Sequence, residues 1–470
     1  MIHASADRHD VARFALVHVG NDEVYGLEFV AEEIVAAGHT FQWFDGEEAN
    51  VIDSIVAYDA TAACFSPLTT FFLPMVKLAR RLKARAPHIR TVFGGAHITA
   101  SEEHIHTEGV DIAVIGPVYG TIPEILTVPD KSIIRGQAVM PDKMIPRRRE
   151  YFQSVPRIGR RHRKTMMSHF GCVYACAYCA THNQRNVIGA TAYQKFYLTR
   201  RPIDHLIEEA RILLEFDTKE VCLEDDDALE GLEAEAWMHE FAPRWKQEIG
   251  LPVYANVTPK TVTKVSDSHL RDFSHLVHFV NLGVQTARAS SLKLFNRGFQ
   301  KEEQIKEAYD RLTAFGIRVK LELIIGLPVD DPVGDAIDTI KCAQRIGAGG
   351  FGAAFPLMLY PGTALYKWCQ DNNVPMNDEC TFEWYSGVGS IKFEDPDVAK
   401  QIHNLSKLAP FFIKYNVEER WMRALMNVDM SQETSKLVSQ NNYLEALTTR
   451  QSETAEESFG EVLTYMNFRF

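Results

Sequence analysis

Three cysteines spaced four and then three residues apart constrain this chain more than any other feature. Cys172, Cys176 and Cys179 lie in the segment 171–179, and a loop with this spacing can wrap three thiolates around one metal centre. Thiolates are ligands that suit iron–sulfur clusters and zinc. A cubane cluster normally takes four cysteines, and the sequence offers no fourth one nearby. One iron would therefore stay open to an outside ligand, as in a reactive metal centre.

A zinc site is the alternative reading of the same cysteines. His169 lies three residues before Cys172, and His182 lies three residues after Cys179, so these side chains could also form a Cys3His zinc site. Zinc modules, however, usually supply their ligands as two close pairs. This triplet stands alone after a strand-like segment at residues 166–170. The spacing favours an iron–sulfur cluster and leaves zinc as the alternative.

The other five cysteines are scattered, which indicates a reducing compartment rather than a disulfide framework. We therefore expect the protein in the cytoplasm. The first ten residues lack the apolar stretch of a signal peptide, and no run of about 18 apolar residues predicts a membrane span. A net charge of −12 argues against a general nucleic-acid binder. The scattered cysteines are Cys64, Cys222, Cys342, Cys369 and Cys380.

The first part of the chain alternates strand and helix patterns, which predicts a doubly wound (Rossmann-like) parallel sheet over residues 1–130. Ligands of such sheets bind beyond the carboxyl ends of the strands. Small residues recur at those ends, as a bulky ligand close to the backbone requires. The strand patterns lie at residues 14–19, 40–44, 62–65, 91–93 and 111–115. The small residues include Gly20, Ser66, Gly94, Gly95 and Gly116.

Residues 131–164 are expected to connect this domain to the rest of the chain. The segment is rich in proline and in basic side chains. It is either a solvated linker or a positive collar near an anionic ligand or the cluster. The basic residues are Arg147, Arg148, Arg149, Arg160, Arg161, Arg163 and Lys164.

Strand and helix patterns resume after the cysteines. With the strand that precedes the cysteines they make about six β/α units, enough for an open or partial (β/α)6 barrel over residues 165–395. The final segment, residues 396–470, is charge-rich and mainly helical in pattern, and we expect it to form a helical cap or an oligomer contact. The later strand patterns lie at residues 219–223, 253–256, 277–282, 319–325 and 350–355.

The cysteine motif C-x3-C-x2-C, with the aromatic Tyr178 before its last cysteine, resembles the signature of radical S-adenosylmethionine (radical SAM) enzymes. The resemblance covers roughly residues 160–370, because further segments follow in the order typical of that family. These segments are Val221–Asp227, Leu282–Thr286, Phe295–Gly298, Leu323–Pro328 and Tyr360–Thr363.

The resemblance implies a 4Fe-4S cluster on the three cysteines that cleaves S-adenosylmethionine reductively, with an electron from an external flavodoxin- or ferredoxin-type donor. It places Tyr178 near the adenine, although a tyrosine buried in the core needs no such role. Asp225 and Asp226 are expected to meet the ammonium group of the cofactor, or to cap the next helix. Gln285 and Glu322 are expected at its ribose. A glutamate on an apolar strand is costly to bury without a partner, which favours a function for Glu322.

Residues 1–130 separately resemble the cobalamin-binding domain fused to many of these enzymes. The marks are Gly38-His39 followed by Asp45, Ser66-x-Leu68-Thr69, Gly94-Gly95-x-His97, and Asp111 leading into Gly116. The resemblance implies that Ser66, Leu68, Gly94 and Gly95 line the pocket for the corrin tail. His97 would either reach a ligand or hold a structural hydrogen bond.

Two parts of the cobalamin pattern are missing. The loop after the first strand reads Gly20–Gly26 in place of the Asp-x-His-x-x-Gly motif that supplies an axial histidine elsewhere. Gly116–Tyr119 replaces the usual Gly-Glu-x-Glu. A vestigial or structural domain therefore stays open as an alternative. A dinucleotide domain is disfavoured because no Gly-x-Gly-x-x-Gly follows the first strand.

Three functions follow from these readings. The leading expectation is a cobalamin-dependent radical SAM methyltransferase acting on an unactivated carbon, or on phosphorus, of a small-molecule substrate. The second is a radical SAM enzyme that moves no methyl group but cyclises, rearranges or transfers a 3-amino-3-carboxypropyl group. The third, from another class, is a zinc-stabilised binding protein without catalysis.

Overall fold

The structure is a computed structural model that describes residues 11–140, 144–347, 350–377 and 389–430. The far amino-terminal residues and the expected cap beyond residue 430 lie outside the described residues. The chain forms two compact units. The first comprises residues 1–171, 183–222 and 247–251, and the second comprises residues 172–182, 223–246 and 252–470.

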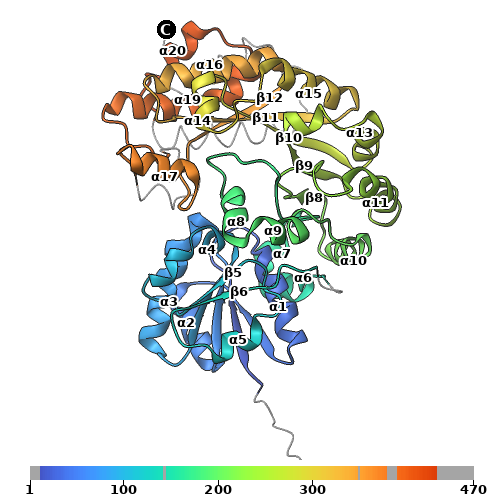
Figure 1. Cartoon of the computed structure of the whole chain (residues 1–470), viewed down its shortest axis with the longest axis vertical. Helices are drawn as coiled ribbons and strands as arrows, with labels where there is room; N and C mark the ends of the chain where they lie inside the picture. Colours follow the sequence, from blue (N-terminus) through green and yellow to red (C-terminus); the bar gives the residue numbers. More distant parts are fainter. Residues whose placement is uncertain (1–10, 141–143, 348–349, 378–388, 431–470) are drawn as a thin grey trace, which may run out of the picture. The chain divides into compact units, whose positions relative to one another are not determined.

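The first unit contains the expected doubly wound parallel sheet (Figure 1). Its strand order is β2-β1-β3-β4-β5-β6. Every residue of β3 and β5 is buried, because helices cover both faces of the sheet. Figure 1 shows α2 and α3 on one side and α1 on the other. The strands are β1 (Arg13–Val17), β2 (Thr40–Phe44), β3 (Ala62–Phe65), β4 (Arg90–Phe93), β5 (Ile112–Ile115) and β6 (Ser132–Arg135). The helices are α1 (Tyr25–Ala36), α2 (Glu48–Ala57), α3 (Phe72–Arg85), α4 (Gly95–Ala100) and α5 (Ile122–Thr127).

The basic segment at residues 131–164 is more ordered than a solvated linker. It begins with β6 and continues into the short helices α6 (Arg148–Ser154) and α7 (Pro156–Gly159). Arg148 and Lys164 are fully buried. The Lys164 ammonium donates hydrogen bonds of 2.8 Å to the carbonyl oxygens of Ile158 and Gly159. These two basic side chains hold the segment in place and are not part of a solvated or ligand-facing surface.

A second sheet of six strands has the order β12-β11-β10-β9-β8-β7. The order is consecutive and the edge strands are the first and the last, as in the expected partial barrel. The strands are β7 (Arg163–Met166), β8 (Glu220–Leu223), β9 (Val253–Val257), β10 (Val277–Gln285), β11 (Arg318–Ile325) and β12 (Phe351–Pro356). The intervening helices include α10 (Ile203–Leu214), α11 (Ala234–Glu248), α13 (Asp267–Ser274), α15 (Glu302–Ala314) and α16 (Pro332–Ile346).

Strand β11 shows how the two faces of this sheet differ. Val319, Leu321 and Leu323 are buried, whereas the alternating residues Lys320 and Glu322 are partly exposed. The strand therefore packs one face against helices such as α16 and turns charged side chains to the other face. This alternation has the period of two that a strand requires.

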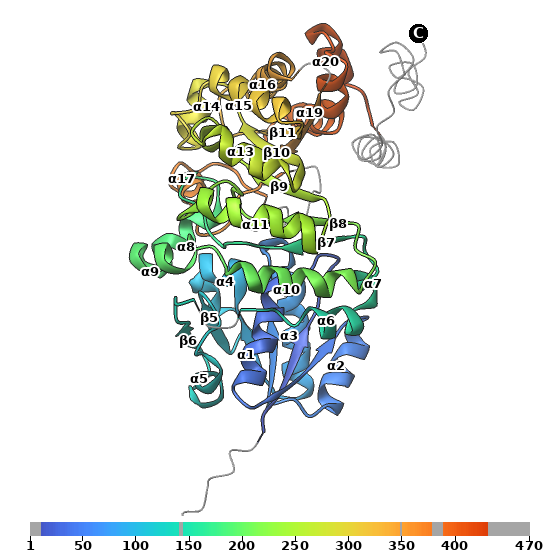
Figure 2. The ribbon, with the colours of Figure 1, turned by 90° about the vertical axis from the view of Figure 1, so that its right-hand side faces the viewer.

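Helix α19 (Pro396–Lys414) belongs to the second unit and packs on β12 and on α16, near which it is labelled in Figure 2. The contact with β12 is close, because a Cβ atom on Gly352 would lie 2.4 Å from the Ile413 side chain. No helix among the described residues is long and apolar enough to span a membrane. The remaining helices are α8 (Ala180–Ile188), α9 (Ala190–Phe196), α12 (Pro259–Val262), α14 (Ala289–Leu294), α17 (Ala364–Asp371) and α20 (Glu419–Leu425).

Candidate iron–sulfur and corrin sites

The three cysteines of the motif occupy one loop of the second unit, and none of them forms a disulfide. The Cys179 amide donates a hydrogen bond of 3.1 Å to the Cys176 carbonyl oxygen, which closes a tight turn. The Cys179 thiol interacts electrostatically with both of the other thiols. The loop therefore gathers three sulfur ligands without linking them to one another.

Backbone contacts from distant parts of the second unit hold this loop in place. The Ala177 amide donates to the Phe295 carbonyl oxygen at 3.0 Å, and the Ala177 carbonyl accepts from the Leu365 amide at 2.8 Å. The Asn296 side chain donates to the Ala175 carbonyl oxygen at 2.8 Å. A loop of mostly small residues is thus fixed by groups more than a hundred positions away in the sequence.

The surroundings of Cys172 and Cys179 favour the protonated form of both thiols. Burial raises the pKa of Cys179 to about 11, and the nearby Asp226 carboxylate adds to this shift. Burial and then Asp226 also raise the pKa of Cys172. Asp226 itself accepts a hydrogen bond of 3.1 Å from the Thr181 hydroxyl. Binding of a metal centre would displace the thiol protons, as it does in other thiolate sites.

The described residues form no site for a single metal ion at the cysteine loop. Among them, no three His, Cys, Asp or Glu side chains surround one position that a metal ion could occupy. The Cys3His zinc arrangement is therefore not seen there. A cubane makes a different demand, because each thiolate binds a different iron and the sulfurs need not converge on one point. Three cysteines on one anchored loop are compatible with that demand.

Arg297 is the residue at this site whose importance the sequence did not reveal. Its side chain is only 4% exposed, and one guanidinium nitrogen lies 3.5 Å from the Cys176 sulfur. The same nitrogen donates to the Tyr178 hydroxyl at 3.2 Å. Arg297 belongs to the segment Phe295–Gly298, which the sequence singled out only as one of the family segments.

Tyr178 and the acidic residues after β8 lie around this loop. The Tyr178 ring packs on Phe295 with 4.7 Å between ring centroids. Asp225 is fully buried, and its carbonyl oxygen accepts a hydrogen bond from the Asn256 side chain. Because the next helix begins only at Ala234, neither Asp225 nor Asp226 caps it. Proximity to the thiols distinguishes Asp226 from a residue of a simple turn.

Gln285 is the last residue of β10, and Glu322 lies inside the neighbouring strand β11. Gln285 has a φ of +68°, next to a bulge in the pairing of β10 with β11. Such a conformation is strained for a residue with a side chain, and strain of this kind gathers at functional sites. Glu322 pairs in register with Gly283, and its carboxylate forms an ion pair of 3.0 Å with Lys320. Glu322 therefore has the partner that a glutamate on an apolar strand needs.

The residues expected to line a corrin pocket lie together in the first unit. A Cβ atom on Gly95 would lie 2.3 Å from the Ser66 hydroxyl oxygen, and Gly95 has a φ of +80°. Gly94 precedes it in extended conformation at the end of β4. Leu68 is 42% exposed. Glycine is thus required at position 95, where the loops after β3 and β4 approach each other. The partly exposed apolar side chain of Leu68 follows β3 in the same loop as Ser66.

His97 is held by structural contacts. It is buried, and its two ring nitrogens lie 3.0 Å from the Thr69 hydroxyl and 2.8 Å from a ring nitrogen of His104. Burial lowers the pKa of His97 to about 3, so the ring is neutral. Of the two roles expected for this residue, the structure shows the structural hydrogen bond.

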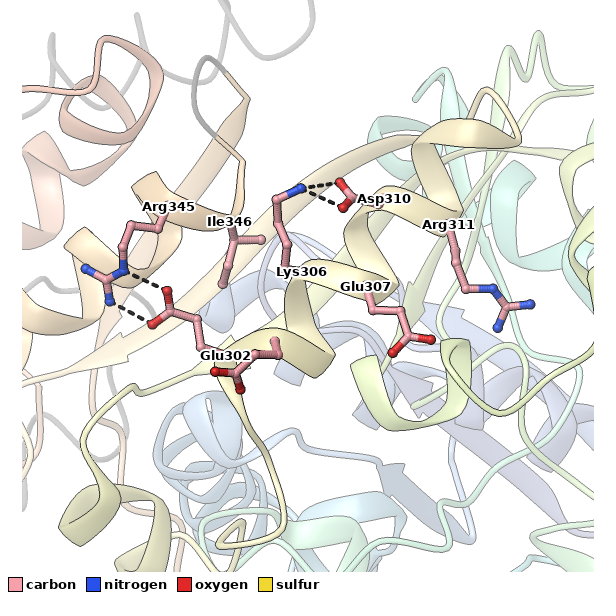
Figure 3. Close-up of a pocket in the computed structure, with 8 residues that line it drawn as sticks. Glu302, Lys306, Glu307, Asp310, Arg311, Arg345 and Ile346 are labelled. Carbon is pink, nitrogen blue, oxygen red and sulfur yellow. Dashed lines mark hydrogen bonds and ion pairs between the residues drawn. The ribbon is translucent and has the colours of Figure 1, made fainter.

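Each unit has a hollow among its described residues. In the first unit, a hollow of about 450 Å³ lies at the carboxyl ends of β1 and β2 and is lined by residues that include His18, Asp45 and Arg157. In the second unit, a hollow of about 530 Å³ lies on α15 and α16 (Figure 3). Several of the charged side chains that line it form surface ion pairs, such as Arg345 with Glu302.

The comparisons with known proteins match both parts of this arrangement. The B12 binding domain family matches residues 14–126, and the Radical SAM superfamily matches residues 166–340. The chain combines a B12-binding domain with a radical SAM domain. The cysteine loop and Arg297 fall inside the radical SAM match, and the glycine-rich strand ends fall inside the B12-binding match.

Solved structures share the fold of this radical SAM protein. It resembles the radical S-adenosylmethionine methyltransferase TsrM from Kitasatospora setae with cobalamin and a [4Fe-4S] cluster bound, with a TM-score of 0.60, 14% identity, and coverage of 77% of this chain and 78% of that chain. It also resembles the cobalamin-dependent S-adenosylmethionine radical enzyme OxsB with aqua-cobalamin bound, with a TM-score of 0.64, 10% identity, and coverage of 98% and 76%. No curated protein sequence matches the chain.

The domain pair settles the cofactor class of this radical SAM enzyme. The radical SAM domain implies a 4Fe-4S cluster and S-adenosylmethionine, and the B12-binding domain implies cobalamin. The residues present are compatible with both cofactors. The three cysteines on the anchored loop suit the cluster, and the glycine-lined strand ends near Leu68 suit cobalamin.

Proposed function

We propose that this protein is a cobalamin-dependent radical SAM methyltransferase that acts on an unactivated carbon, or on phosphorus, of a small molecule. The observation that carries the proposal is the anchored loop with three cysteines outside any disulfide and no fourth cysteine nearby in the sequence. The B12-binding match over residues 14–126 and the fold shared with a cobalamin-bound methyltransferase support the methyl-transfer part.

The residues divide into three proposed roles. The thiols of Cys172, Cys176 and Cys179 hold the cluster, which when bound supplies the electron that breaks a carbon–sulfur bond of S-adenosylmethionine. A second group of residues, next to the loop or at strand ends, binds and orients that cofactor. A third group leaves room for the corrin tail. The second group is Tyr178, Asp225, Asp226, Gln285 and Glu322, and the third is Ser66, Leu68, Gly94 and Gly95.

The Asp226 carboxylate is the best supported of the cofactor-binding groups. Its negative charge acts on the thiols of Cys172 and Cys179, so it lies close to the loop that would hold the cluster. A carboxylate at that position attracts the ammonium group of an amino acid. The neighbouring Asp227 is a weaker candidate for this role, because its carboxylate already accepts hydrogen bonds from the amides of Leu229 and Thr258.

The experiment is anaerobic purification followed by counting iron, sulfide and cobalt and by analysis of the products after reduction. We expect iron and sulfide near four each, stoichiometric cobalt, and formation of S-adenosylhomocysteine together with 5′-deoxyadenosine. Cys176→Ala should abolish cleavage of S-adenosylmethionine and lower the iron content. Cys369→Ala, which removes a buried thiol of α17, is the matched control and should keep both. Turnover that persists in Cys176→Ala would falsify the site.

A radical SAM enzyme without methyl transfer is the second candidate. The observation that favours it is the fold shared with the cobalamin-dependent S-adenosylmethionine radical enzyme OxsB, which extends over 98% of this chain. Methylthioadenosine as the product would identify 3-amino-3-carboxypropyl transfer. Formation of 5′-deoxyadenosine without S-adenosylhomocysteine would identify cyclisation or rearrangement. A colourless protein that contains zinc and no iron would exclude both candidates.

Two further parts of the proposal concern the cell. We propose a cytoplasmic location, because the scattered cysteines indicate a reducing compartment. We also propose that a small flavodoxin- or ferredoxin-type protein supplies the electron. Turnover that depends on such a donor, in the absence of a chemical reductant, would support this part.

A further inference from the structure

Arg297 carries a positive charge into the interior without a carboxylate to balance it. Its guanidinium donates to the Gln300 side-chain oxygen at 2.6 and 3.1 Å and to the Gly283 carbonyl oxygen at 3.0 Å. Its other contacts are the Tyr178 hydroxyl and the Cys176 sulfur. No carboxylate among the described residues shares a hydrogen bond or an ion pair with it.

A buried cation with only neutral partners is costly, because hydrogen bonds to amides do not replace the lost hydration of a full charge. None of the hydrogen-bond partners of this guanidinium is a carboxylate. Of the groups that Arg297 touches, a phenol stays neutral near pH 7, so the thiol of Cys176 is the one that becomes an anion when it binds iron. The missing negative charge is therefore supplied by the loaded cluster.

Groups outside the cysteine loop hold the guanidinium next to the sulfur of Cys176. Gln300 accepts two of its hydrogen bonds, and Gln300 is itself fixed because its side-chain amide donates to the Val284 carbonyl oxygen at 2.6 Å. The fork of Arg297 has five donors in a rigid plane. Four contacts on different sides leave it little freedom to turn away from the sulfur.

We propose that Arg297 is a positioning residue that sets the reduction potential of the cluster through its charged hydrogen bond to the Cys176 thiolate. This rests on the proposed function, because it requires the cluster. Reduction adds one electron from the external reductant to the cluster, and no bond to Arg297 forms or breaks. A fixed positive charge beside a ligand sulfur stabilises the more negative, reduced form and so raises the potential. Hydrogen bonds to the ligand sulfurs are a recognised means of tuning such clusters.

The test is a redox titration of the reconstituted protein without S-adenosylmethionine, followed by electron paramagnetic resonance, with iron and sulfide counted on the same samples. Arg297→Gln should keep the cluster but shift the ratio of reduced to oxidised form at least tenfold toward the oxidised side at a fixed potential, which is about 59 mV for one electron. Arg297→Lys keeps the charge and should recover part of the shift. Arg345→Gln, which removes one cation from the surface of Figure 3, should leave the potential unchanged.

The outcomes separate this inference from the proposed function. A wild-type protein that binds no iron defeats the proposed function. A fully loaded Arg297→Gln variant with the wild-type potential overturns the inference, and a weaker affinity for S-adenosylmethionine in that variant would show that the guanidinium serves the cofactor's carboxylate instead. If Arg297→Gln loses the cluster, Gln300→Leu carries the test. It leaves the charge but removes the support of the fork, and an unchanged potential in that variant also overturns the inference.

Discussion

Arg148 offers the sharpest test of how the first unit is held together. The side chain is fully buried, and its two terminal nitrogens lie 3.0 Å from carboxylate oxygens of Glu28 and Glu23. A third carboxylate, that of Glu209, lies 3.7 Å from the remaining nitrogen and pairs with Arg201 at 2.8 Å. Three carboxylates therefore share two guanidinium groups in the buried interior of the first unit.

Replacing Arg148 with methionine keeps the length and the apolar stem but removes one of the two positive charges. Glu28 is affected most, because Arg148 donates the hydrogen bond to one of its side-chain oxygens and the other oxygen has no partner. Leaving a buried carboxylate unpaired typically costs about 3–5 kcal/mol of unfolding free energy. We expect a loss of that size for Arg148→Met near neutral pH.

The loss should shrink in acid. Burial already raises the pKa of Glu28 well above its ordinary value, and Arg148 opposes that rise. Without Arg148 the folded protein binds a proton at Glu28 more tightly still than the unfolded chain does. A group of this kind favours the folded state at low pH and disfavours it as the pH rises. Arg148→Met should therefore approach the wild type in stability between neutral pH and about pH 5.

The assay is urea unfolding of the cofactor-free protein at several pH values, with hydrogen exchange to assign the change to the first unit. Arg149→Met is the matched control, because its side chain is half exposed and pairs with Glu215 at the surface. It should change stability little. Adding Glu28→Gln to Arg148→Met should recover part of the loss. The reasoning is refuted if Arg148→Met is as stable as Arg149→Met near neutral pH, or if its loss does not vary with pH.

Two further predictions concern the two cofactor regions. Gly95→Ala should cost about 1–3 kcal/mol and weaken cobalamin retention, because it adds both backbone strain at φ +80° and a clash with Ser66. Gly38→Ala is the control, because φ is +82° there and no atom lies within 4 Å, so this variant adds the backbone strain without the clash. Equal losses of stability and of corrin absorbance in the two variants would contradict the role of Ser66. Burial raises the pKa of Asp227 to about 6, above the value of about 3.9 in an unfolded chain, so wild-type stability should fall as the pH rises from about 4 to about 6. Asp227→Asn should lack that part of the slope in urea unfolding, and equal slopes in both proteins would count against the shift.

The sequence was sufficient to predict both parallel sheets. Strands of the first sheet such as β3 and β5 are buried on both faces and appear as short apolar runs, and β11 of the second sheet shows an alternation of buried and partly exposed residues. It missed β6, whose four residues Ser132–Arg135 include only two apolar side chains. An edge strand of this length is stabilised by pairing with β5, which a local pattern does not reveal. The burial of Arg148 was missed for a related reason. Its partners Glu23, Glu28 and Glu209 are distant in the sequence. The sequence also does not distinguish the buried Arg148 from its exposed basic neighbours such as Arg149.

The cysteine loop was predictable because its three cysteines are close together in the chain. Arg297 was not, since it reaches Cys176 only after the fold has brought positions 121 residues apart into contact. The assignments for Gln285 and Glu322 stay predictions. The structure adds strain at the first and an ion pair with Lys320 at the second, and only the strain is a feature that a purely structural residue would not need.

The two buried arginines obey the same electrostatics with opposite results. Arg148 lies among carboxylates that balance its charge within the folded chain, so its environment is complete without a ligand. Arg297 is equally inaccessible, yet its oxygen partners are neutral and its remaining neighbour is a thiol. Burying a charge without a counter-charge is unfavourable for any chain, so we infer that an anion accompanies Arg297 in the loaded protein. The guanidinium lies 3.5 Å from the sulfur of Cys176, and the thiolate that this cysteine forms on binding iron is the anion that we propose.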